Sequence, residues 1–233
     1  AALFQDTLGS GKVAELDLHD FIGLCAFMAT VRRRISPYLG RDGFANIRAG
    51  LVELLSGMSD TSATDERISA FCARFREDSA HRFVRDLAAE VLHNVDPERY
   101  PLMNRWVWDA KTNTGAVREI WFGDNVDHMT IPLADGYATF LMLREELAQF
   151  LTNQGVFRDV IFFTDMLLAQ IYAGYISAQG GTYLRADFSS AEDPMHHARR
   201  ILGLDGLRPG SSRTRVKAED GRAFLLEDIK MLG

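Results

Sequence analysis

The stretch FRDVIFFTDMLLAQIYAGYISA, residues 157–178, decides the fold of this chain. Only Asp165 carries a charge between positions 160 and 176, and apolar side chains fall on every side of a helix drawn through them. A helix that is apolar all round is either a central core helix or a membrane span. A span needs about 20 mostly apolar residues with few charges. Asp165 and Gln170 interrupt the run and Arg158-Asp159 precede it, so we predict a core helix and no membrane span.

Helical patterns extend from this stretch toward the N-terminus. Apolar residues that alternate with charged ones predict a long helix over 134–153, and Gly155 provides the short link of a helical hairpin. Apolar stripes at helical spacing predict further helices at 16–35, 43–55, 68–75 and 83–92. Residues 3–14, which contain Gly9-Ser10-Gly11, are expected to form a loop.

The middle of the chain is marked by two prolines. Asp96-Pro97 and Pro101 both suit a helix start, because proline is tolerated in the first helical turn. The sequence therefore predicts a helix over 102–109. Residues 117–122 fit either a short helix or a strand.

The pattern changes after Gly180-Gly181. Asp193-Pro194 predicts a short helix that ends near Leu202. Two strand-like runs then flank the turn Glu219-Asp220-Gly221-Arg222, and an Asp-Gly turn between such runs indicates a β-hairpin.

Together these patterns predict a mainly α fold, a multi-helix bundle-like single domain with a small C-terminal β-hairpin. The domain is expected to span 1–233, with a helical core over about 15–203 and the hairpin over about 211–228. Seven or eight helices would pack around the 157–178 helix. No Pro/Gly/Ser-rich stretch divides the chain, and 47% of its residues are hydrophobic, enough for one large core.

The composition limits which classes of partner and which cellular compartment are expected for this protein. The net charge of −6 argues against a nucleic acid as partner, although Arg32–Arg34, Arg41 and Arg48 leave a local basic patch as a minor hypothesis. Cys25 and Cys72 lie among apolar neighbours, which predicts two buried free thiols in a reducing compartment. No secretory leader is recognisable, so a cytoplasmic location is expected. The chain starts at Ala1 without Met, which indicates a processed or missing end.

None of the candidate catalytic motifs in the sequence contains all the residues that its chemistry requires. Gly9-Ser10-Gly11-Lys12 lacks the first glycine of a phosphate loop, since Asp6 stands there, and Val13 replaces the serine or threonine. His19-Asp20 resembles the pair of the helical HD-type metal phosphohydrolases, but those need an earlier histidine and none is present. The sequence identifies no cofactor.

The densest group of chemically active residues runs from position 100 to 128. It contains all three tryptophans, with arginine and aspartate beside them, a composition typical of binding hot spots. On a helix over 102–109, tryptophans two residues apart would face nearly opposite sides, one toward the core and one toward a ligand or partner. The alternative is a helix that anchors the core. The candidate binding residues are Arg105, Trp106, Trp108, Asp109, Arg118 and Trp121.

Carboxylates provide a second set of candidates. Asp165 lies midway along the most apolar helix, where burial is costly unless the group is paired or neutral. Arg158, Asp165 and Tyr172 are seven apart and share one line of that helix. Asp124, Asp127 and His128 supply oxygen and imidazole ligands that could hold a divalent cation.

Two functional hypotheses follow. The favoured one is a non-enzymatic helical binding or assembly protein that acts through the 100–128 segment on a protein partner or a second copy of itself. The alternative is a helical small-molecule or metal-dependent enzyme with an acidic site near Asp124, Asp127, His128 and Asp165, for which a small-molecule ligand is possible.

Overall fold

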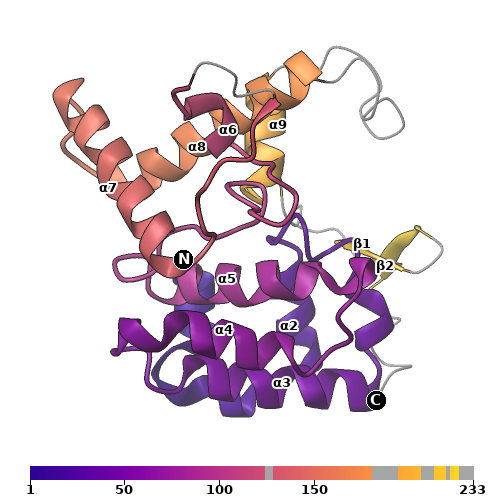
Figure 1. The fold of residues 1–233 in the computed structure, drawn as a ribbon. Coiled ribbons are helices and arrows are strands. Elements are labelled where there is room, and N and C mark those ends of the chain that lie inside the picture. Colours follow the sequence, from indigo (N-terminus) through magenta and orange to yellow (C-terminus); the bar gives the residue numbers. More distant parts are fainter. Residues whose placement is uncertain (124–127, 180–193, 206–212, 219–220, 226–233) are drawn as a thin grey trace. The chain divides into compact units, whose positions relative to one another are not determined.

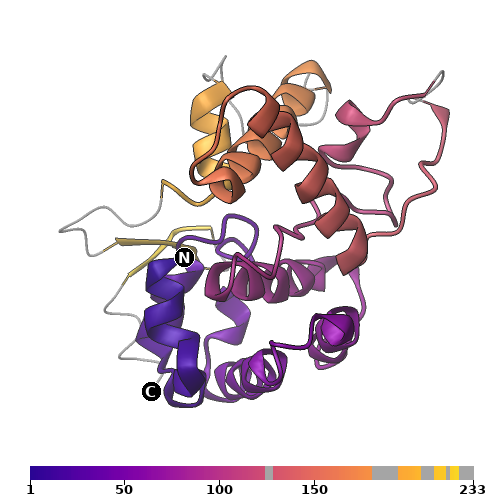
Figure 2. The same cartoon turned by 90° about the vertical axis from the view of Figure 1, so that its left-hand side faces the viewer.

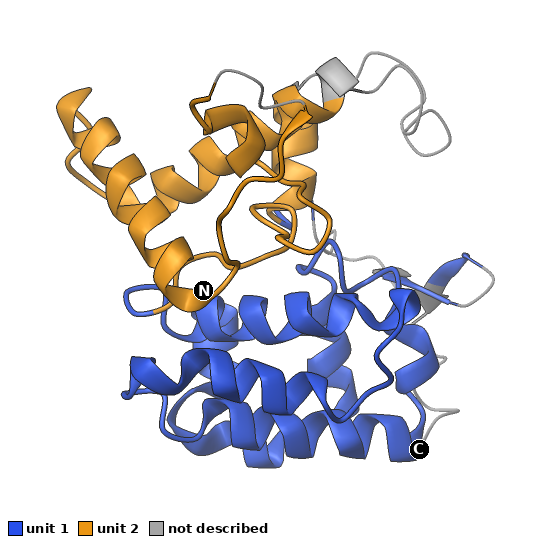
Figure 3. Ribbon diagram, viewed as in Figure 1, with its two compact units in different colours: residues 1–99, 203–233 blue, residues 100–202 orange. Residues whose placement is uncertain are grey.

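Helices make up most of the structure, so the predicted mainly α class is confirmed. The computed structural model describes residues 1–123, 128–179, 194–205, 213–218 and 221–225. The chain forms two compact units, one built from 1–99 with 203–233 and the other from 100–202 (Figure 3). The prediction of one domain over 1–233 remains a prediction, because this division does not show whether either unit folds by itself.

The first unit is a group of short helices (Figures 1 and 2). Its α-helices are α1 Ala2–Leu8, α2 Leu18–Cys25, α3 Arg41–Leu55, α4 Thr64–Cys72 and α5 Phe83–Val95. Short 3-10 turns connect them: η1 Gly9–Glu15, η2 Ser36–Tyr38, η3 Thr61–Ala63 and η4 Ser79–His81. The helices predicted at 43–55, 68–75 and 83–92 are thus confirmed, with ends that differ by a few residues.

Helix α5 is the core helix of the first unit. It packs against α1, α3 and α4, and most of its side chains are buried, including Leu87, Ala88 and Leu92 without any exposed surface. Its buried set also includes Asp86, Glu90 and His93. Such complete burial explains why only part of its apolar face stood out in the sequence.

Two predictions for the N-terminal region are wrong. Residues 3–8 belong to helix α1 rather than to a loop, because Phe4 and Leu8 lie one turn apart and are both buried, whereas the 3-10 segment that follows is interrupted at Ser10 and Gly11. The helix predicted over 16–35 ends at Cys25 and gives way to turns. The carbonyl of Ala26 accepts a hydrogen bond of 3.1 Å from the Arg32 guanidinium, so a side chain takes the role that a continuing helix would give to a backbone N–H.

The same Arg32 connects the N-terminal and C-terminal parts of the first unit. Its guanidinium forms a bidentate ion pair with Asp205, with distances of 2.9 and 3.1 Å, and its side chain is almost fully buried. The Arg32 carbonyl accepts the backbone N–H of Lys217 at 2.9 Å. Lys217 ends strand β1, Arg213–Lys217, which pairs antiparallel with β2, Ala223–Leu225. The turn expected at Glu219 and Asp220 lies outside the described residues, so the hairpin as a whole remains a prediction.

The second unit contains α6 Val117–Ile120, α7 Tyr137–Asn153, α8 Val160–Gln179 and α9 Pro194–Ile201. Helix α8 packs against the other three. The long helices predicted at 134–153 and 157–178 are therefore confirmed, and so is the short helix after Asp193. In the described part of the chain, no helix is both long and apolar enough to cross a membrane.

The prediction that α8 is a fully surrounded central helix is wrong. Thr164, Asp165 and Leu168 are buried, but Phe162 and Phe163 are exposed on another side of the helix. The apolar residues of α8 therefore lie on two faces, of which only one is covered by the residues that the structure describes.

We predict that Asp205→Asn lowers the free energy of unfolding by about 3 kcal/mol, because it leaves the buried Arg32 cation without its counter-charge. Urea denaturation followed by circular dichroism measures the change. The matched control is Glu53→Gln, which removes the carboxylate of the Arg74–Glu53 pair, where Glu53 is largely exposed. This control should cost no more than about 0.5 kcal/mol. Equal losses in the two variants would show that the Arg32–Asp205 pair has no special role.

Candidate functional site

The tryptophan segment is a folded-back loop and not the helix predicted over 102–109. Asp109 and Thr114 exchange backbone hydrogen bonds of 2.9 and 3.3 Å. The N–H groups of Ala116 and Val117 then donate to the carbonyls of Trp106 and Val107 at 2.9 and 3.1 Å. These backbone groups pair across the loop, so they are not available for the i to i−4 bonds of a helix.

Gly115 makes this pairing possible. Its φ of 129° lies in a region that side chains disfavour. A Cβ atom at this position would lie 2.5 Å from the carbonyl oxygen of Val107. Only glycine allows the two arms of the loop to approach this closely.

Two of the three tryptophans are buried, contrary to the expectation that one of Trp106 and Trp108 would face outward. The Trp108 indole N–H donates to the Leu133 carbonyl at 3.0 Å. The Trp106 ring packs on Tyr172 of α8 at a centroid distance of 5.5 Å, and its indole N–H has no hydrogen-bond partner among the described residues. Trp121, which directly follows α6, is half-buried. The burial of Trp106 and Trp108 favours the anchoring alternative for these two residues.

Polar side chains of the segment hold its own loops together. Asp109 is buried and its carboxylate accepts the Thr112 N–H at 3.2 Å. Arg118 donates to the Asn113 carbonyl at 3.2 Å. The candidate Arg105 is half-buried and interacts with at least one other group.

Asn113 is a residue that the sequence did not single out. Its side-chain amide donates to the Met129 carbonyl and accepts the Ile131 N–H, both at 2.9 Å. Its φ of 55° is one that asparagine tolerates better than most residues. An asparagine between Thr112 and Thr114 was the only sequence signal, and it is typical of many turns.

Of the carboxylate candidates, the structure describes Asp165. Asp165 is buried on α8 and interacts with at least one other group. Tyr172, two turns further along the same line of α8, contacts Trp106. The structure thus brings the tryptophan segment to the helix line that carries Asp165.

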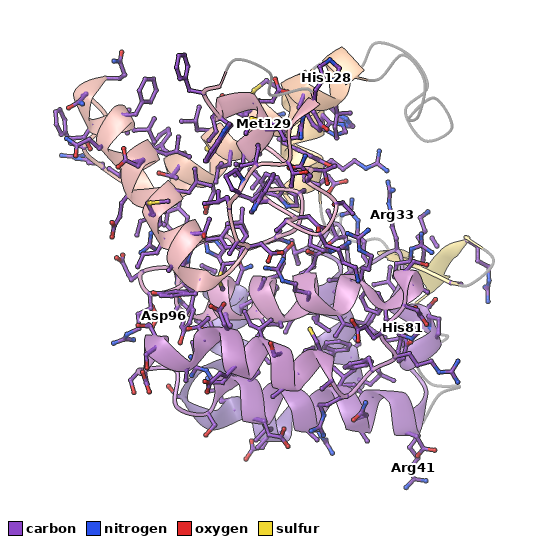
Figure 4. All side chains as sticks on the ribbon, viewed as in Figure 1. Arg33, Arg41, His81, Asp96, His128 and Met129 are labelled. Carbon is purple, nitrogen blue, oxygen red and sulfur yellow. The ribbon has the colours of Figure 1, made fainter. Side chains whose placement is uncertain are left out.

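The predicted metal ligands remain a prediction. Asp124 and Asp127 lie outside the described residues, and His128 is exposed after α6 (Figure 4). Among the described residues, one group has ligand atoms within 4.8 Å of one another: Asp17, His19 and Asp20, all exposed. Asp17 caps α2 by accepting the Asp20 N–H at 2.8 Å, so a helix start accounts for this cluster.

The remaining polar candidates have structural surroundings. Cys25 and Cys72 are both free, as predicted, although Cys72 is only half-buried. Burial raises the pKa of the Cys25 thiol well above its usual value, and burial also raises the pKa of Cys72. A raised pKa disfavours the reactive thiolate.

The arginines of the minor nucleic-acid hypothesis do not gather on one surface. Arg32 is buried in its ion pair with Asp205, and Arg48 lies over the Phe44 ring at 5.7 Å. Arg33 and Arg41 are far apart in Figure 4.

A surface that the sequence did not predict lies at the junction of α7 and α8. Five large apolar side chains are exposed within 17 residues of chain, and we call them the junction patch. With their exposed fractions they are Phe150 (52%), Phe157 (74%), Phe162 (46%), Phe163 (43%) and Met166 (37%). Large apolar patches mark interaction sites, whereas single exposed apolar residues are ordinary, so this stretch is the candidate contact surface.

No protein-family model, curated protein or solved structure matches this chain.

We predict that Gly115→Ala destabilises the protein by about 3 kcal/mol, because it adds backbone strain and a clash with Val107. Urea unfolding gives the free energy, and a red shift of tryptophan emission reports exposure of Trp106 and Trp108. Gly155→Ala is the matched control, since Gly155 also has a positive φ, 88°, but open space around it. It should cost about 1 kcal/mol without a red shift. A similar loss in both variants would mean that the close approach to Val107 is unimportant.

Proposed function

We propose that this chain is a non-enzymatic binding or assembly protein and that the junction patch is its contact surface. The observation that supports this most directly is the exposure of Phe150, Phe157, Phe162, Phe163 and Met166 within one short stretch of the chain. Large aromatic and methionine side chains are enriched in protein interfaces, and charged residues are depleted from interface centres. The exposed side chains of α8 between 160 and 176 include no charged residue.

The area of the patch is sufficient for a specific contact. An aromatic side chain buries about 150–250 Å² when fully covered, so the exposed fractions correspond to roughly 500 Å² of apolar surface. At about 25 cal/mol per Å², covering it would release on the order of 12 kcal/mol of gross hydrophobic free energy. Association consumes much of this gain through lost translational and side-chain freedom, and the surplus is the binding free energy.

The 100–128 segment takes a supporting role in this proposal. Trp106 packs on Tyr172, and Trp108 bonds to the Leu133 carbonyl just before α7. These contacts connect the segment to α8 and to the approach of α7. The half-buried Trp121 is the tryptophan of the segment that is accessible enough to touch a partner.

The alternative function, a small-molecule or metal-dependent enzyme, is supported by one observation. Asp165 is a buried carboxylate, and the buried indole N–H of Trp106 has no partner among the described residues and lies beside Tyr172 on the same helix. A ligand with a hydrogen-bond acceptor would satisfy that N–H group. The metal site at Asp124, Asp127 and His128 remains part of this alternative, and a cytoplasmic location remains part of both.

A photo-cross-linking experiment tests the binding proposal. We predict that benzoylphenylalanine in place of Phe157, in the full chain inside the cells that produce it, gives discrete protein adducts on irradiation. Adding Phe163→Glu should reduce the adduct yield about tenfold, because a charge at an interface centre costs at least 1.4 kcal/mol of binding free energy.

The control is the same photoreactive residue at Leu204, which is 67% exposed and lies outside the junction patch. It should give no discrete adduct. Equal labelling from positions 157 and 204, or labelling that is insensitive to Phe163→Glu, would contradict the proposal.

A further inference from the structure

Four of the five exposed residues of α8 between 160 and 176 form a straight seam. The five are Phe162, Phe163, Met166, Gln170 and Gly174. At about 3.6 residues per turn, positions 163, 166, 170 and 174 fall within an arc of about 80°, and 163 and 174 differ by only about 20°. With about 1.5 Å of rise per residue, the seam is about 16 Å long.

The seam is tapered and uncharged. Its first turn carries phenylalanine, its middle carries Met166 and Gln170, and its last position is Gly174. A Cβ atom built on Gly174 would meet nothing within 4 Å, so there is open space above this glycine. A neutral seam offers nothing to nucleic acid, an acidic peptide or an anionic lipid surface. It matches another neutral apolar helix.

We infer that a second copy of this chain covers the seam, through antiparallel pairing of α8 with α8 of the partner subunit about a two-fold axis. This inference rests on the proposed function and names its partner. In antiparallel pairing, the Phe163 ring of each copy lies over the open space at Gly174 of the partner subunit, and Met166 lies near Gln170 of the partner subunit. The bulky end of each seam thus fills the small end of the other, which satisfies close packing.

A parallel pairing fits the seam poorly. It would place the two Phe163 rings against each other at one end and two glycines against each other at the other end. The rings would hold the helices apart and leave a gap at the glycines, and unfilled space forfeits dispersion contacts.

The available area agrees with a dimer. A standard interface buries about 800 Å² per partner, of which about 55–65% is apolar. The junction patch as a whole exposes roughly 500 Å² of apolar surface. No exposed charged side chain of α8 between 160 and 176 would be trapped opposite its own copy.

The first test is the oligomeric state of the full chain. Sedimentation equilibrium at about 20 µM should give twice the mass of one chain for the wild type. Phe163→Glu should give one chain mass, with an unchanged circular dichroism spectrum, because position 163 is exposed within one copy. Leu204→Glu is the matched control and should remain dimeric. A wild type of one chain mass, or a dimer that survives Phe163→Glu, would overturn the inference.

The second test establishes the direction of pairing. In a Cys72→Ser background, Phe163→Cys and Gly174→Cys chains are oxidised separately and as a mixture. The mixture should form a disulfide-linked dimer, whereas each variant alone should not, because like positions would be about 16 Å apart and a disulfide requires Cα atoms within about 7 Å. Cross-linking of the Phe163→Cys chain with itself, or no cross-link in the mixture, would overturn antiparallel pairing.

The outcomes separate this inference from the proposed function. If position 157 gives an adduct with a different protein while the chain sediments as a monomer, the inference is wrong and the binding function stands. If position 157 gives no adduct with any protein, including a second copy, both are wrong.

Discussion

The bidentate ion pair between Arg32 and Asp205 is the interaction on which the organisation of the chain depends. It joins residues 173 positions apart. Closing a loop of that length costs about 4–5 kcal/mol in chain entropy by the logarithmic rule. A nearly buried pair offsets such a cost only with good geometry and further hydrogen bonds. Arg32 has both, because its guanidinium also donates to the Ala26 carbonyl and its own carbonyl accepts the Lys217 N–H.

Backbone geometry as well as charge therefore holds the C-terminal segment against residues 26–32. Gly203 has a φ of 69°, and a Cβ atom there would overlap the Phe27 carbonyl. The glycine, the ion pair at Asp205 and the strand that reaches Lys217 act in succession on one short stretch around residues 26–32. Because both 99 and 203 belong to the first unit, the second unit is an insertion whose two ends are held.

The sequence predicted those elements in which local preference and burial agree. Helices α3, α4, α5 and α7 have an apolar stripe with a polar remainder or a clear end signal, and each was found near its predicted position. The sequence-based prediction was wrong where tertiary contacts determine the backbone. An example is the end of α2 at Cys25, after which the Arg32 side chain donates to the Ala26 carbonyl. For the candidate site, sequence located the tryptophan segment and offered core anchoring as one of two alternatives for it, and it placed Asp165 within the apolar helix where the structure buries it. It missed the junction patch, because apolar residues all round a helix are compatible with a core, a membrane or a partner.

An error in local structure led directly to the wrong expectation about tryptophan exposure. On a helix, residues two apart face nearly opposite sides, which predicts that one of Trp106 and Trp108 is free to meet a ligand. Gly115 instead lets the backbone fold back and pair with the Trp106 and Val107 carbonyls, and both indoles are buried. Once these aromatic rings are assigned to anchoring, the large apolar groups still in contact with water include Phe122 beside the segment and those of the α7–α8 junction. Covering them is the favourable free-energy change that the fold itself leaves unrealised.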